Sequence, residues 1–69
     1  MAVLLPIALL ASGVIVRPVA NLHSRPGDEA DVVSQAIYAS NVGWLEEKDG
    51  WVKVRTADDY TGWTPSASV

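Results

Sequence analysis

Apolar and polar residues alternate along the chain from about residue 14, which is the period of β-strands and not of helices. The first strand is expected around Val14, Val16 and Val19. Pro18 interrupts it and cannot donate to a sheet ladder, so this strand should lie at an edge or bend there. Further strands are expected at residues 32–38, 41–47 and 51–56, followed by a short strand at residues 63–64.

Turn residues separate these segments. Residues 21–31 contain Pro26, Gly27 and Asp28 together with other acidic residues, and they are expected to form one long loop. Asp49-Gly50 lies between two alternating segments and predicts a tight hairpin, because glycine accepts a positive φ without steric cost. Residues 57–62 predict a second turn.

The predicted strand at residues 51–56 has two distinct faces. Side chains alternate across a strand, so residues two apart share a face. The apolar face should pack in the core, and the other should line an outer surface or groove. These faces consist of Val52, Val54 and Thr56 on the core side, and Trp51, Lys53 and Arg55 on the outer side.

About five short strands, with turns every 8–12 residues, indicate an all-β protein closed into a small barrel. Closure removes the unpaired edges that favour aggregation. An OB-type barrel is the nearest alternative, but it commonly needs longer strands and a helix. Residues 28–38 have partial helical spacing, yet the adjacent Val32 and Val33 and the short length favour a strand.

The first 13 residues form a separate apolar segment. Residues 2–11 are almost wholly apolar and too few to span a bilayer as a helix, which needs roughly 20. They are similar to the apolar region of an export signal, with Ala11-Ser12-Gly13 as a small-residue cleavage site, but no Lys or Arg precedes them. The alternative is an arm that packs on a neighbouring domain. The barrel itself is expected at residues 14–69.

Composition narrows the functional classes. The 69 residues carry 5 basic and 8 acidic side chains, a net charge of −3, which disfavours nucleic acid and anionic membranes as partners. There is no cysteine, so a thiol nucleophile and a disulfide framework are excluded. With the single histidine, His23, and no Gly-x-Ser-x-Gly motif, the sequence predicts no catalytic residues, no metal site and no cofactor.

Four segments together resemble a bacterial SH3 (SH3b) domain, which implies a small SH3-like barrel. They are residues 19–26 (VANLHSRP), 33–36 (VSQA), 45–55 (LEEKDGWVKVR) and 59–63 (DYTGW). The resemblance covers about residues 14–66. The first, second and last segments are similar, more narrowly, to the N-terminal SH3b domain of NlpC/P60 cysteine peptidases of the γ-D-glutamyl-L-diamino acid endopeptidase (dipeptidyl-peptidase VI) type.

That resemblance implies a non-catalytic module of a peptidoglycan endopeptidase. Its partners would be an NlpC/P60 catalytic domain, which this chain does not contain, and a stem peptide, L-Ala-γ-D-Glu-diamino acid. A free-standing module that targets wall peptides, and a purely structural docking domain, are the alternatives. The location would be exported or wall-associated, or cytoplasmic in peptidoglycan recycling. The family usually has glycine at the position of Ala39 and a smaller residue at that of Trp44.

Tyr60 and Asp59 are the first candidate binding residues, at the predicted tip of the last hairpin. The resemblance implies that this tyrosine walls the pocket for the free L-alanine amine. A carboxylate can pair with that ammonium group, and a phenol can donate a hydrogen bond to the peptide. A polar hairpin tip without a ligand is the competing interpretation.

Trp51 and Trp63 are further candidates, because rings beside hairpins form the shallow peptide grooves of SH3-like barrels. The competing interpretation is that both tryptophans close the ends of the barrel. His23 is expected to be a surface loop residue.

Overall fold

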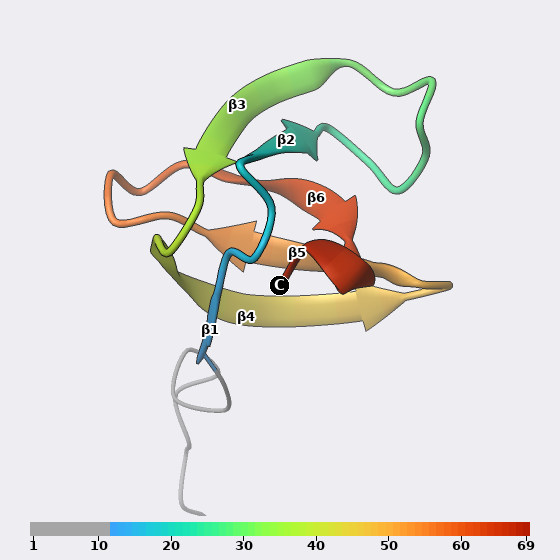
Figure 1. Cartoon of the computed structure of the whole chain (residues 1–69). Coiled ribbons are helices and arrows are strands. Elements are labelled where there is room, and N and C mark those ends of the chain that lie inside the picture. Colours follow the sequence, from blue (N-terminus) through green and yellow to red (C-terminus); the bar gives the residue numbers. More distant parts are fainter. Residues whose placement is uncertain (1–11) are drawn as a thin grey trace, which may run out of the picture.

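The computed structural model describes residues 12–69, and strands are the main regular elements in this range (Figure 1). They are β1 (Ser12–Val14), β2 (Val19–His23), β3 (Val32–Ile37), β4 (Asn41–Lys48), β5 (Trp51–Arg55) and β6 (Thr61–Pro65), followed by a single 3-10 turn, η2 (Ser66–Ser68). The all-β class predicted from the alternation is confirmed.

The strands form one antiparallel sheet in the order β1-β4-β5-β6-β2-β3, and the sheet curls around a small core (Figure 1). The segment that joins β1 to β2 draws the ends of the sheet together. The Ile15 N–H donates to the Ser40 carbonyl at 3.0 Å, and the Ile15 carbonyl accepts from the Ala39 N–H at 2.8 Å. The Val16 N–H donates to the Ser68 carbonyl at 2.9 Å. These bonds attach the β1–β2 segment to the β3–β4 turn and to the C-terminal turn, while β1 and β3 are the two ends of the sheet order.

Small and β-branched side chains fill the interior. Val52 and Val54 of β5 are fully buried, as their alternation predicted, and Trp44 packs partly buried against the same cluster. Burial of aliphatic side chains stabilises by about 1.5–3 kcal/mol each. The buried cluster comprises Ile15, Ala20, Leu22, Ala36, Val42, Val52 and Val54.

The first expected strand is two strands in the structure. Residues 15–18 separate the two strands, and Pro18 lies just before β2. Strand β1 pairs with β4, whereas β2 pairs with β3 and β6. The prediction that residues 21–31 form one loop was wrong at its start, because β2 continues to His23. Buried Ala20 and Leu22 alternate with exposed Val19 and Asn21, which is the side-chain pattern of a strand over residues 19–22.

The other boundaries differ from the predicted ones by a residue or two. The alternative helix over residues 28–38 is wrong, since β3 begins at Val32. The Asp49-Gly50 hairpin is confirmed, with φ values of 50° and 85°. Positive φ at both central residues is the geometry that matches the twist of the flanking strands.

The predicted apolar segment, residues 1–13, lies outside the described residues except for Ser12 and Gly13, which belong to β1. Residues 12–69 contain no helix that is long and apolar enough to cross a membrane.

Candidate functional site

The turn between β5 and β6 is built by hydrogen bonds among its own residues. The Thr56 N–H donates to the Tyr60 carbonyl at 2.8 Å, and the Thr56 carbonyl accepts from the Asp59 N–H at 2.9 Å. The Thr56 hydroxyl oxygen also accepts from the Tyr60 N–H at 3.2 Å. Asp59 has a φ of 72°, a left-handed conformation that aspartate tolerates better than most residues. The turn therefore holds the backbone of Tyr60 in a defined position.

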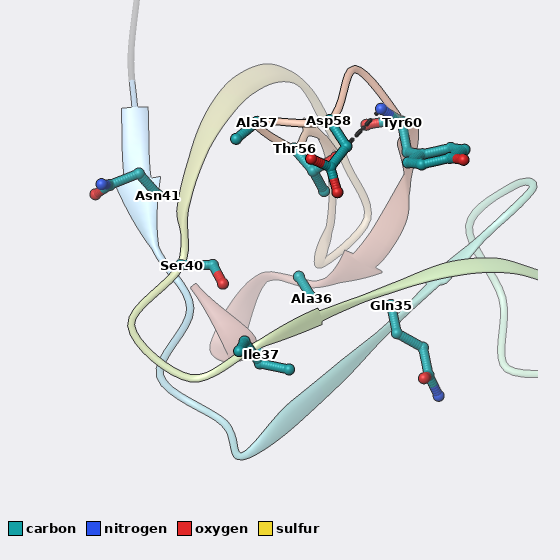
Figure 2. Close-up of a pocket in the computed structure, with 9 residues that line it drawn as sticks. All are labelled: Gln35, Ala36, Ile37, Ser40, Asn41, Thr56, Ala57, Asp58 and Tyr60. Carbon is teal, nitrogen blue, oxygen red and sulfur yellow. Dashed lines mark hydrogen bonds between the residues drawn. The ribbon is translucent and has the colours of Figure 1, made fainter.

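A groove of about 380 Å³ lies between this turn and strand β3 (Figure 2). Its volume is within the range of small-ligand sites. The Tyr60 side chain is 57% exposed and forms part of one wall, whereas Ala36 is buried on the β3 side. The lining residues are Gln35, Ala36, Ile37, Ser40, Asn41, Thr56, Ala57, Asp58 and Tyr60.

Asp58 is the one charged residue among those that line this groove. The other lining side chains are neutral hydroxyls, amides and apolar groups. A ligand bound here would meet a carboxylate and a phenol but no cation from the groove. Since a carboxylate favours an ammonium or guanidinium partner, the groove suits a ligand with a positive group.

Asp59, the carboxylate predicted for the site, does not line the groove. Its Oδ1 lies 3.8 Å from Nε of Arg55, and both side chains are largely exposed to solvent. Such an exposed ion pair contributes at most about 1 kcal/mol. The turn instead brings Asp58 to the groove with Tyr60. Which of two adjacent aspartates lies at a groove depends on the turn geometry, and the sequence carries no signal for that.

Trp51 and Trp63 lie apart from the groove, around the end of β2. The Trp51 ring meets His23 edge to face, with centroids 5.4 Å apart and planes at 89°. Trp63 pairs with His23 across the sheet and is only 8% exposed. The expectation that His23 is a surface loop residue is wrong, because it is buried and its Nδ1 lies 2.9 Å from the Ala30 carbonyl oxygen. His23 thus links the tryptophans to the loop at residues 24–31.

A second hollow of about 310 Å³ lies where β2 meets the C-terminal end of β6. Thr64 and Ser68 line it and are buried. The Thr64 hydroxyl is buried without a hydrogen-bond partner among the described residues. His23 and Asp28 also line this hollow, but none of the four predicted binding residues does.

Metal-ligating side chains are not clustered in the described part of the chain. Residues 12–69 hold no group of three His, Asp and Glu side chains placed to bind a metal ion. The geometry supports noncovalent recognition through a groove with a phenol, a carboxylate and an adjacent strand. The described residues thus form a small all-β domain with a groove beside the β5–β6 turn.

The chain belongs to the bacterial SH3 domain family, because the model of that family matches residues 18–69. Neither the comparison with curated proteins nor the comparison with solved structures found a match. A domain of this family is non-catalytic by itself, and the family favours a module that binds cell-wall material or a partner domain.

Proposed function

We propose that this chain is the SH3b module of a peptidoglycan stem-peptide endopeptidase of the NlpC/P60 kind. In this role it docks the catalytic domain and helps to form the pocket for the free L-alanine end of the substrate. The proposal rests on the resemblance of the Asp-Tyr-x-Gly-Trp segment to that family. The catalytic cysteine and histidine would come from the partner domain.

The observation that carries the proposal is the position of Tyr60. Its ring is more than half exposed beside the groove, while hydrogen bonds to Thr56 hold its backbone. A substrate with a free amine and a small alanine methyl group fits this chemistry. The phenol can hydrogen-bond to the peptide, the ring can cover the methyl group, and the Asp58 carboxylate can pair with the ammonium. Asp59, which faces Arg55, is the weaker candidate for that pairing.

The roles of Trp51 and Trp63 are separate in this proposal. Trp63 is nearly sealed from solvent, so it supports the sheet face beneath any contact rather than stacking on a ligand. Trp51 is half-buried and keeps part of its ring at the surface, where the catalytic domain would dock.

The test is Tyr60→Phe in the peptidase that this module accompanies. The variant keeps the ring and removes the hydroxyl. With L-Ala-γ-D-Glu-diamino acid peptide as substrate, we expect KM to rise about three- to tenfold, the loss of one hydrogen bond. Tyr38→Phe is the matched control, because Tyr38 is also exposed but does not line the groove. Equal kinetics for the two variants would remove Tyr60 from the pocket.

A free-standing wall-targeting module is the second candidate function, and family membership favours it directly. It predicts that this chain alone sediments with purified sacculi. A sacculus pull-down in which the chain stays in the supernatant would eliminate this alternative, whatever the result with Tyr60→Phe.

A further inference from the structure

Strand β3 is the last strand in the sheet order and has a hydrogen-bonded neighbour on one side only, β2, among residues 12–69 (Figure 1). The groove borders β3 and lies between this strand and the β5–β6 turn (Figure 2). We propose that this open edge binds an extended, cationic segment of a partner protein by strand addition. The inference goes beyond the proposed function, because it gives the groove a second ligand, an α-linked polypeptide, which would compete with the stem peptide for Tyr60 and Asp58.

The register shows which backbone groups are open. Val19 lies opposite Ile37, and Asn21 lies opposite Gln35. One position further along, the Tyr38 N–H donates to the Pro18 carbonyl at 3.1 Å, so that pair is hydrogen-bonded. Bonded and non-bonded pairs alternate in antiparallel ladders.

The Val19–Ile37 and Asn21–Gln35 pairs are therefore the non-bonded ones. Consistent with this, the Gln35 and Asn21 side chains are close enough to bond, with Nε2 donating to Oδ1 at 2.8 Å. It follows that the N–H and carbonyl of Gln35 and the N–H of Ile37 point away from β2. Gln35 and Ile37 also line the groove, so the unpaired backbone groups border a hollow that can receive a ligand.

One irregularity interrupts the edge of β3: its register with β2 shifts between Ser34 and Val32, at the N-terminal end of the strand. Proteins commonly block an open edge with Lys, with Pro or with a bulge. The strand has the sequence Val-Val-Ser-Gln-Ala-Ile and contains neither Lys nor Pro. The register with β2 is regular from residue 34 to residue 37. This edge is thus suited to pairing with another extended backbone, which is the ligand that its alternating donors and acceptors recognise.

The groove selects the side chains of that ligand. Ala36 is a small and nearly buried part of the β3 wall, so only a small ligand side chain can approach it. Tyr60 supplies a ring on the opposite wall, and Asp58 is the sole charge among the lining residues. The favoured occupant is an extended segment with small residues toward Ala36 and a Lys or Arg that reaches Asp58. A second copy of β3 is less suited, because β3 has no cation to offer Asp58.

Amide hydrogen exchange on the full chain tests the open edge first. The Gln35 and Ile37 amides should exchange much faster than the Ala36 amide, which faces Ala20 of β2, and the Tyr38 amide, which donates to the Pro18 carbonyl. Saturation with acetyl-Lys-Thr-Ala-Val-Ala-Thr-amide should slow exchange at Gln35 and Ile37 alone by at least about tenfold. Slow exchange at Gln35 and Ile37 in the free protein, at every protein concentration, would show that the edge is already covered and would overturn the proposal.

N-methylation of the peptide separates strand pairing from nonspecific contact. Two versions carry methyl groups on alternate residues, either the second and fourth or the third and fifth. In a strand, alternate N–H groups face opposite sides, so one version should bind at least about tenfold more weakly than the other. Equal affinities for the two versions, or no shift of the Gln35 and Ile37 amides at millimolar peptide, would refute strand addition.

Charge selection has its own matched pair of variants. Asp58→Asn should weaken binding of the lysine peptide and reduce its salt dependence, whereas Asp49→Asn, at the β4–β5 turn, should not. If protection of Gln35 instead rises with protein concentration in the absence of peptide, the occupant is a second copy and the proposal is wrong. Failure of these tests leaves the stem-peptide role of Tyr60 intact, because that role is measured by cleavage.

Discussion

Ala39 occupies a backbone conformation that suits glycine. Its φ is 69°, in the turn that leads from β3 into β4, and its N–H donates to the Ile15 carbonyl at 2.8 Å. The left-handed region places the Cβ of an L-residue close to its own carbonyl oxygen. Asp49 and Asp59 share this region, but aspartate tolerates it. Among the non-glycine residues of 12–69 that have a positive φ, Ala39 is the one with an apolar side chain. Ala39→Gly should therefore stabilise the protein.

The magnitude follows from two opposing effects. Relief of the left-handed strain is worth about 1–2 kcal/mol for a residue with a Cβ. Glycine gives the unfolded chain more freedom, which costs about 0.4–1 kcal/mol. The Ala39 side chain is exposed, so its removal leaves no cavity. The expected net gain is about 0.5–1 kcal/mol, which corresponds to a rise in Tm of about 2–8 °C for a chain of this size.

The assay is thermal and urea unfolding of the full chain, followed by tryptophan fluorescence and circular dichroism. Ala57→Gly is the matched control, since Ala57 is also exposed in a turn but does not have a positive φ. That variant should lose about 0.4–1 kcal/mol through the unfolded state alone. The two glycine variants should thus change stability in opposite directions.

The sign of the stability change tests whether residue 39 is strained by its positive φ. Suppose that Ala39→Gly destabilises the chain as much as Ala57→Gly does. The backbone at residue 39 then carries no cost for alanine, and the turn has another geometry in solution. A gain in both variants would instead show that the stabilisation is not specific to the positive φ of residue 39.

Two further substitutions test the packing of β6. Gly62→Ala should destabilise by about 1–3 kcal/mol, because a Cβ there would lie 2.7 Å from the Leu22 Cβ, and an unfolding midpoint equal to that of the unmodified chain would show that β2 and β6 are less closely packed. Thr64→Val replaces a buried hydroxyl, which has no hydrogen-bond partner among residues 12–69, with a methyl group of similar size. It should stabilise by about 1 kcal/mol in urea unfolding, whereas a loss of stability would indicate that a bound water satisfies the hydroxyl.

Local patterns were enough to predict most of the strands. The alternation around Val52 and Val54 identified both the strand and its buried face, and Asp49-Gly50 identified the hairpin that precedes it. These predictions succeed because side-chain period and turn conformation are properties of a few neighbouring residues. The predicted start of the loop at residue 21 was wrong, because the polar residues Asn21 and His23 indicated a loop although both lie in β2. His23 remains in β2 because its ring packs on Trp51 and its Nδ1 lies beside the Ala30 carbonyl.

The candidate site was predictable only in part. Tyr60 could be selected because the hairpin and the family resemblance both pointed to it. Asp58 could not be chosen over Asp59, because the difference arises from the positive φ of Asp59 and its contact with Arg55. No local sequence pattern indicated that β3 forms a wall of the groove, because Gln35 and Tyr60 are 25 positions apart (60 minus 35) in the chain.

The amino-acid sequence by itself determined the strand period, the tight hairpin and the lack of cysteine chemistry, because each depends on residue types and their immediate spacing. Tertiary structure alone decided which strand keeps an open edge, which aspartate faces the groove and that the histidine is buried. Those features depend on the order in which strands pair around the barrel. Strand order is set by contacts between distant segments, which no short stretch of residues encodes.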